Sequence, residues 1–360
     1  MDFHPVQGAL LVTNDALQGA FAVAGPDGLR PVPELSRGVR MTEHSQRVER
    51  VIGSYPGTLW LQTFDAVPDP HPDNPSMISR LFRHDGGAWK PVGDPRSKDF
   101  LWAGWTSGPG CLVGARGPYA GRAARAALDC PGRKVPVRPF PDPGAEWRVE
   151  QGRPSPAGDV VLLERSYDKP WEFHLVVMTA ADPPEVATRS IPFPDVVRER
   201  KADVLQDHRR SLIVLSPTDV YLPLALAAKP GTNGAGAAEP MLLHFDGKSF
   251  ARVDLPALEG GVPVLALAPD GALLLAGRRA TRAGEDFTVW RRAPGQPFQV
   301  VGDYRSPAGE GHWNAYDLWA GANGDLWIGA VRVGDEQAQP RSRVLHAGPV
   351  REVWKPPAAP

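Results

Sequence analysis

The sequence predicts an all-β protein, a seven-bladed β-propeller built from four-stranded antiparallel blades. Glycine and proline, 38 and 40 of the 360 residues, are too frequent for a helical protein, since their usual combined share is only about 12%. Short apolar segments alternate with turns marked by Gly or Pro along the whole chain, and this pattern recurs about every 50 residues. A four-stranded antiparallel unit at such a period is typical of a propeller blade.

Each repeat opens with a hairpin of two apolar strands around a tight turn. The clearest copy is YDLWAGANGDLWIG at 316–329, in which Asn323 and Gly324 supply the positive-φ turn residues. The tetrapeptide LWAG stands at 101–104 and again at 318–321, in equivalent places of two repeats. The turns of these first hairpins are expected at Gly8, Gly57, Gly110, Gly158, Arg210, Gly271 and Gly324.

A second hairpin follows the first in each repeat. Residues 81–92 (LFRHDGGAWKPV) and 242–253 (LLHFDGKSFARV) show it almost residue for residue, and the seventh copy is expected to turn at 346–349 (HAGP). In the fifth repeat an alternative stays open, in which the first hairpin turns after Leu215 instead of at Arg210. The blades of this single domain, 1–360, are predicted near 1–36, 37–95, 96–143, 144–194, 195–256, 257–307 and 308–357.

The competing architecture is an irregular pair of β-sandwiches, which also have short strands at regular spacing. Sandwiches rarely repeat a tetrapeptide at the same structural place, and the two LWAG segments therefore favour the propeller.

Charge and hydropathy exclude several classes of function. The chain carries 40 basic and 41 acidic residues, a net charge of −1, which argues against nucleic acid as a partner. No apolar run approaches the roughly 18 residues of a membrane helix, so membrane insertion is not expected. The first residues show no basic segment followed by an apolar one, so no signal peptide is expected in this numbering, although a mature form that begins at Met1 stays open.

One repeat carries a family motif. The segment NGDLWIG at 323–329 resembles the two-component-regulator propeller repeat, whose core is a D/N-G-x-L-W-I-G strand. The resemblance implies a propeller, and in that family such propellers are extracytoplasmic sensor or binding modules. The turn DGGAW at 85–89 also resembles the Asp-box of sialidase-like propellers, which is a structural turn and implies no sialidase chemistry.

The mouth of the central channel is the predicted ligand-binding site. Asp203 and Asp317 are expected to begin the innermost strands of their blades, where charged side chains would surround the channel. Carboxylates with one Arg at such a mouth suit a cation or a polar ligand. The candidate residues are Arg50, Asp99, Asp203, Asp317, His312 and Trp313. Catalytic residues are not identified, because no Ser-His-Asp order, HExxH or P-loop is present.

The insert at 64–75 offers the one weak metal site. Asp65, Asp69 and Asp73 carry oxygen donors of the kind that calcium prefers. Four prolines in the same segment favour an extended, solvated loop that spreads these donors apart. No metal site is therefore assigned and no cofactor is predicted, with calcium as the alternative.

Charged and aromatic loop residues suggest a partner surface. The segment 195–210 has mixed charges, which predict a solvated loop or short helix or, alternatively, a docking surface. The tryptophans at 60, 102, 319 and 327 fall in predicted strands and are expected in the core, whereas those at 105, 171 and 313 lie near turns, where an indole can stack on a sugar or anchor a protein. The candidate partner-binding residues are Trp171, Arg198, Arg200, Asp207 and His208.

The two cysteines bear on the compartment. A hairpin that pairs symmetrically about the loop at 117–121 places Cys111 opposite Cys130, within the distance that a disulfide accepts. Such a bridge would indicate an oxidising compartment, so a periplasmic or secreted location is favoured. Both residues can equally be small buried hydrophobes, and a cytoplasmic location stays open.

The function expected from these observations is that of a non-catalytic binding module or scaffold, which presents one loop face to a protein or glycan partner. The alternative is a propeller hydrolase or lyase with a metal or acid/base site at the channel mouth.

Overall fold

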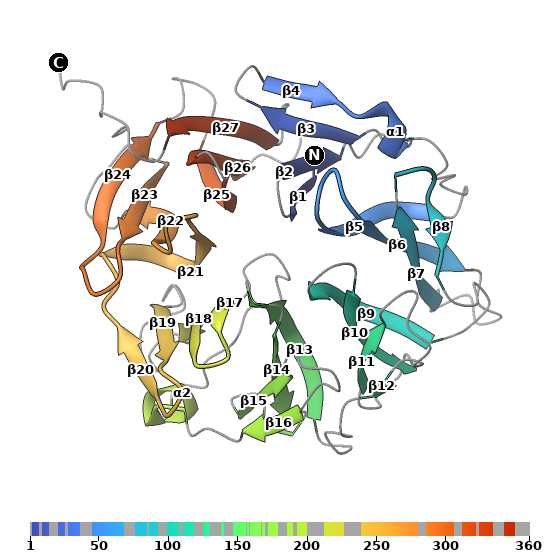
Figure 1. The fold of residues 1–360 in the computed structure, drawn as a ribbon. Coiled ribbons are helices and arrows are strands. Elements are labelled where there is room, and N and C mark those ends of the chain that lie inside the picture. The colour runs from blue at the N-terminus through green and yellow to red at the C-terminus, as the bar shows by residue number, and fades with distance from the viewer. Residues whose placement is uncertain are drawn as a thin grey trace. The chain divides into compact units, whose positions relative to one another are not determined.

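The computed structural model of the chain consists of antiparallel β-sheets with, in the residues that it describes, two short helices (Figure 1). The predicted all-β class is confirmed. Neither of these helices, four and five residues long, has the length and apolar character that crossing a membrane requires. The described residues are 2–6, 9–13, 21–25, 28–36, 45–67, 76–84, 86–92, 99–107, 111–118, 125–129, 138–139, 147–155, 157, 159–166, 168–169, 172–178, 186–189, 193–199, 212–226, 239–279, 286–305, 312–321, 324–333 and 342–349.

The chain divides into two compact units. Unit 1 comprises Met1–Glu164 and Val177–Ala187, and unit 2 comprises Arg165–Val176 and Thr188–Pro360. Within the described part of the chain, three sheets belong entirely to unit 1 and three to unit 2. The strands of the remaining sheet have residues in both units.

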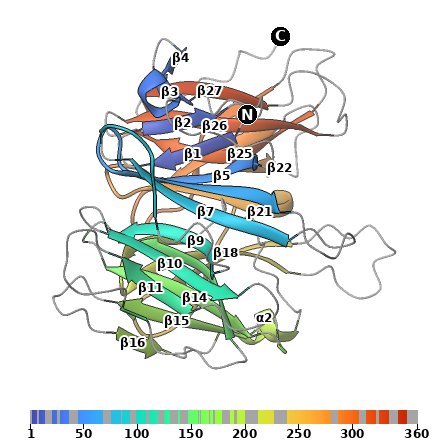
Figure 2. The same ribbon diagram turned by 90° about the vertical axis from the view of Figure 1, so that its right-hand side faces the viewer.

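The sheets of unit 1 each contain four strands in sequence order, as β9, β10 and β11 show in Figure 2. The strands are β1 (Asp2–Val6), β2 (Ala9–Thr13), β3 (Phe21–Gly25) and β4 (Gly28–Pro31); β5 (Ser45–Gly53), β6 (Leu59–Val67), β7 (Ser76–His84) and β8 (Lys90–Pro91); and β9 (Asp99–Ser107), β10 (Cys111–Pro118), β11 (Arg125–Asp129) and β12 (Arg138–Pro139). The shared sheet consists of β13 (Trp147–Pro154), β14 (Val160–Ser166), β15 (Phe173–Met178) and β16 (Val186–Arg189).

The sheets of unit 2 follow the same plan, and the last of them has three strands within the described residues. The strands are β17 (Ile213–Ser216), β18 (Asp219–Leu226), β19 (Glu239–Phe245) and β20 (Phe250–Val253); β21 (Leu258–Leu267), β22 (Leu273–Arg279), β23 (Phe287–Arg292) and β24 (Gln299–Tyr304); and β25 (His312–Ala320), β26 (Asp325–Val333) and β27 (Ser342–Pro349). Neighbouring sheets bury apolar residues between them, as β21, β22 and β23 do with β25 and β26 around the fully buried Trp313.

Two of the first-hairpin turns form where glycine permits a positive φ. Gly271 (φ +79°) lies between β21 and β22, and Gly324 (φ +88°) lies between β25 and β26. Other side chains rarely adopt this conformation, which is why these turns stand at glycines.

The two LWAG segments both involve the first strand of a sheet but do not lie at equivalent places, so that prediction is wrong. Gly104 lies within β9, opposite Gly114 and three residues before the strand ends, whereas Ala320 is the last residue of β25, opposite Leu326.

Two of the predicted turns are wrong. In the fifth repeat, β17 and β18 pair through Ile213 and Tyr221, so the chain turns at 217–218 and not at Arg210. The apolar run at 212–215 supplies most of β17, and the alternative of a first hairpin that turns after Leu215 is confirmed. In the seventh repeat, β27 continues to Pro349 instead of turning at 346–349, because a register shift against β26 accommodates the extra residues.

The two helices have the same role in their two units. α1 (Pro33–Ser36) accepts a hydrogen bond at the Leu35 carbonyl from the Trp89 indole Nε1, at 2.7 Å. α2 (Asp195–Glu199) follows Phe193, whose ring stacks on that of Phe250 at 4.2 Å. Trp89 and Phe250 occupy equivalent places in their second hairpins, and both are buried.

The register of β10 and β11 agrees with the one predicted around the cysteines. Leu112 lies opposite Asp129 and Arg116 opposite Arg125, which is the symmetric pairing that would put residues 111 and 130 opposite each other. Cys130 itself lies outside the described residues, so the disulfide between Cys111 and Cys130 stays a prediction.

Candidate functional site

A cluster of polar and aromatic side chains joins two neighbouring sheets of unit 2. We call it the His312 cluster, and it consists of Asp286, Tyr304, His312, Trp313 and Arg343. Asp286 directly precedes β23 and Tyr304 ends β24, whereas His312 and Trp313 begin β25 and Arg343 lies near the start of β27. The strand ends of two sheets thus bring these residues together, and the contact between Tyr304 and Arg343 joins positions 39 residues apart.

Asp286 fixes one side of the His312 ring. Its carboxylate Oδ1 lies 3.3 Å from Nδ1 of His312 and accepts the backbone N–H of Trp313 at 3.2 Å. The backbone N–H of Asp286 donates to the Tyr304 carbonyl at 3.0 Å. The Asp286 side chain is only 3% exposed, whereas that of His312 is 67% exposed. Because Nδ1 faces the carboxylate, Nε2 is the ring nitrogen that faces away from it toward solvent.

Arg343 contacts Trp313 and Tyr304 of the cluster. The guanidinium carbon is 4.5 Å from the centroid of the Trp313 ring, a cation–π contact with an indole that is fully buried. One guanidinium nitrogen donates to the Tyr304 hydroxyl at 3.4 Å. The Tyr304 ring in turn stacks on Phe287 at 5.0 Å between centroids. Packing and hydrogen bonding therefore hold both polar groups in place.

This arrangement is suited to proton transfer. A histidine with one nitrogen on a buried carboxylate and the other facing solvent can act as a general base or acid near neutral pH. The carboxylate favours one tautomer and one orientation of the ring. Tyr304 and Arg343 contact the cluster through Trp313, whose side chain lies on the opposite face of β25 from that of His312.

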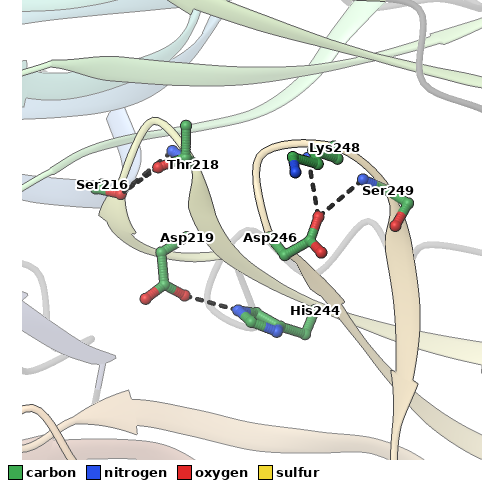
Figure 3. A network of polar contacts seen from close by, with 7 residues as sticks. All are labelled: Ser216, Thr218, Asp219, His244, Asp246, Lys248 and Ser249. Atoms are coloured by element: carbon green, nitrogen blue, oxygen red, sulfur yellow. Dashed lines mark hydrogen bonds and ion pairs between the residues drawn. The ribbon is translucent and has the colours of Figure 1, made fainter.

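A second kind of acidic–basic pair lies within single sheets. Figure 3 shows Asp219, at the start of β18, with its Oδ1 2.8 Å from Nε2 of His244 on β19. The His244 ring stacks on Tyr221 at 4.3 Å. Burial, and then the nearby Asp219 carboxylate, raise the pKa of the Tyr221 hydroxyl.

The same pair recurs in the two following sheets. Asp270 contacts Arg291, and Asp325 lies 3.4 Å from His346, whose ring contacts Trp327 at 4.3 Å between centroids. In each case the acid lies in or beside the first turn of the sheet and the basic side chain on the third strand. Because this acidic–basic contact repeats at equivalent places in three sheets, we interpret it as a structural contact that stabilises each sheet. The Asp286–His312 pair differs from these because it joins two sheets.

The turn beside the Asp219 pair is also structural. Asp246 Oδ1 accepts the backbone N–H groups of Ser249 and Lys248, each at 2.9 Å (Figure 3). These hydrogen bonds, that from Ser249 first, lower the pKa of the Asp246 carboxyl. The turn occupies the place that the Asp-box-like segment 85–89 has in its own sheet, and both connect the third strand to the fourth.

The candidate channel-mouth residues are only partly brought together. His312 and Trp313 belong to the His312 cluster. Asp317 lies within β25, which begins earlier than predicted, at His312; its carboxylate is 4% exposed and accepts the N–H of Leu318 at 3.2 Å. Arg50 lies in β5 and Asp99 begins β9, both in unit 1. Asp203 lies outside the described residues, and β17 begins well after it.

The other predicted sites are less well defined. Arg198 lies on α2, exposed and paired with Asp195 at 2.8 Å, as expected for a solvated short helix. Asp65 lies in β6. The described part of the chain contains no group of three or more acidic, His or Cys residues that could hold a metal ion. Trp171, Arg200, Asp207, His208, Asp69 and Asp73 lie outside the described residues.

Sequence reasoning missed Asp286, Tyr304 and Arg343. They have no spacing motif, because their contacts join residues 26 to 39 positions apart. In the structure each of them lies at or next to the end of a strand, on the side of the sheet where His312 begins β25, and these strand ends were not predicted at these residues.

Comparison with known proteins relates the chain to enzymes by fold. No family model matches it, and no curated protein matches it in sequence. Among solved structures it is similar to a prolyl endopeptidase (TM-score 0.60, 13% identity, 98% of this chain and 48% of that one) and to prolyl oligopeptidase B from Galerina marginata (TM-score 0.56, 10% identity, 96% and 49%). The chain therefore spans about half the length of these peptidases.

A polysaccharide lyase, an ulvan lyase of family PL25, is similar over nearly its full length. The TM-score is 0.56 at 9% identity, with 98% of this chain and 95% of that one covered. A second structure of that lyase is bound to a GlcA(1-4)Rha3S ligand. At these identities the likeness establishes the fold alone. The expectation of a non-catalytic binding module is nevertheless wrong as the main interpretation, because the structures that share this fold over the whole chain are propeller hydrolases and lyases.

Proposed function

We propose that the chain is a polysaccharide-cleaving enzyme, with His312 as the group that transfers protons. The observation that carries the proposal is the Asp286–His312 pair, in which a buried carboxylate orients an exposed imidazole. The extent of the fold supports a glycan substrate, since the lyase matches over 95% of its length and the peptidases over about half.

We also propose that the sheets form one closed, seven-bladed propeller with the predicted boundaries. Six sheets of four strands and one of three, each in sequence order, support this count within the described residues. The resemblance of 323–329 to the two-component-regulator repeat remains a local one, and a periplasmic or secreted location rests on the predicted disulfide.

The test is depolymerisation of a panel of neutral and acidic polysaccharides by the wild type and by His312→Gln. Glutamine keeps a polar side chain of similar length but cannot transfer protons at neutral pH. We expect the wild type to shorten at least one polymer and the variant to be about 100-fold slower or worse, a typical general acid–base contribution. An unchanged rate in a variant with an unchanged melting temperature would refute the role of His312.

A further inference from the structure

We propose that Asn314 binds the sugar unit on which His312 acts, through two neighbouring hydroxyl groups of that unit. This inference rests on the proposed function of His312 and adds a substrate-binding residue and the sugar groups that it recognises. Its basis is the position of Asn314, which lies two residues after His312 on β25 and is exposed.

His312 and Asn314 project from the same face of β25. Side chains alternate between the two faces of a strand, and the register of β25 with β26 is regular from His312 to Ala315. Burial agrees with this assignment, because Trp313 and Ala315 belong to the apolar core between two sheets, whereas His312 and Asn314 are exposed. Positions two apart on a strand are about 6.6 Å apart, so both side chains can contact one bound sugar unit.

The fold does not explain an asparagine at this position. Asparagine is depleted in strands and favours turns and helix caps, where its side chain bonds to nearby backbone groups. Asn314 instead lies inside a nine-residue strand, and within the described residues no hydrogen bond or ion pair engages its amide. The amide nitrogen is therefore available as a donor to a ligand, and the amide oxygen as an acceptor.

Val331 provides an apolar surface beside this amide. It lies directly opposite Asn314 on β26 and is half-buried. Side chains of directly opposite residues project from the same face of a sheet and lie about 5 Å apart. A sugar ring has C–H groups on its faces and hydroxyls around its edge, so the ring can lie against Val331 with its hydroxyls directed at Asn314.

The amide suits a pair of hydroxyls on adjacent carbons. Its oxygen accepts a hydrogen bond from one hydroxyl, and its nitrogen donates one to the other. A carboxylate or sulfate group of a ligand has no proton to donate and would leave the amide oxygen unused. Asn314 thus favours neutral hydroxyls, and it holds the sugar beside the His312 imidazole without transferring a proton itself.

The test measures sugar binding and cleavage separately. Isothermal titration uses β-1,4-linked hexasaccharides of glucose, mannose and xylose, and the same sugars with their hydroxyls O-methylated. The proteins are the wild type, Asn314→Leu and the control Gln299→Met. Leucine has nearly the shape of asparagine but neither donor nor acceptor, and Gln299 is an exposed amide on β24 of the neighbouring sheet.

The expected loss is one of affinity. At least one free hexasaccharide should bind the wild type and Q299M equally and N314L about 10-fold more weakly, since two hydrogen bonds are lost. The O-methylated sugars should bind all three proteins as weakly as N314L binds the free sugar. For the polymer that the wild type cleaves, N314L should raise KM about 10-fold and leave kcat within about threefold, as expected when substrate binding alone is weakened.

Each outcome decides one claim. Normal binding by N314L, an equal loss in Q299M, or no binding of any free hexasaccharide would overturn the role of Asn314. A fall in kcat at an unchanged KM would overturn it as well, because it would place Asn314 in the proton transfer instead of in sugar binding. Sugar binding that depends on Asn314, in a protein that cleaves no polymer, would overturn the proposed function and leave the sugar site standing.

Discussion

Burial in the folded protein disfavours the ionised form of the Glu164 carboxyl group. It lies on β14 with its side chain 4% exposed, and burial raises its pKa from 4.5 to about 7. Between these two values the folded protein binds the proton more tightly than the unfolded chain does. The free energy of unfolding therefore falls as the pH rises through this window. The full penalty, present above the folded-state pKa, is about 3 kcal/mol.

Replacement of Glu164 by Gln should remove this penalty. We expect the variant to be more stable than the wild type by up to about 3 kcal/mol at about pH 8, and the gain to vanish by about pH 4. Urea unfolding at a series of pH values measures it. The control is Glu172→Gln, which removes a carboxylate that is 40% exposed and paired with Lys169. A stability difference for E164Q that does not change with pH would show that the fold does not raise the pKa of Glu164.

α1 and the segment before α2 each pack against an aromatic residue of a second hairpin. Trp89 holds α1 by a buried hydrogen bond to Leu35 and packs against Phe21, with a centroid distance of 6.0 Å. Phe250 holds the segment before α2 by stacking on Phe193. Trp89 and Phe250 therefore make different contacts at equivalent positions, because an indole has an N–H donor and a phenyl ring has none.

The hydrogen bond of Trp89 should contribute measurably to stability. Trp89→Phe keeps a ring but removes the donor to the Leu35 carbonyl, and we expect a loss of about 1–3 kcal/mol in the free energy of unfolding. Tyr55→Phe is the matched control, since it removes an exposed hydrogen bond to Glu34 at 3.3 Å and should change stability by less than about 0.5 kcal/mol. Denaturant unfolding that gives equal values for both variants would contradict this role for the indole.

The strands were largely predictable because turns and apolar alternation are local properties. Gly271 and Gly324 identified their turns through a backbone conformation that other residues avoid. The prediction failed at Arg210, where a charged segment without alternation precedes the true strand, and at 346–349, where a bulge replaces a turn. A bulge depends on the partner strand, so a single sequence gives little sign of it.

The site was less predictable, since its residues meet across two sheets. His312 and Trp313 were found because they enter the first strand of a repeat. Asp286 becomes a partner of His312, and Arg343 of Tyr304, only when the two sheets pack. Comparing equivalent positions in successive sheets separates structural pairs from the candidate catalytic pair, which sequence patterns alone did not do. The Asp–His and Asp–Arg pairs that recur at equivalent places serve the architecture, and the pair that joins two sheets is the candidate for chemistry.

The most direct measurement compares kcat/KM for polysaccharide cleavage by His312→Gln and His244→Gln. Both variants remove an imidazole held by an aspartate, but His244 belongs to the repeated pairs. We predict that H312Q loses about 100-fold or more in kcat/KM and that H244Q stays within about twofold of the wild type. Equal losses in both variants, or a loss in H244Q alone, would contradict the assignment of the His312 cluster as the catalytic site.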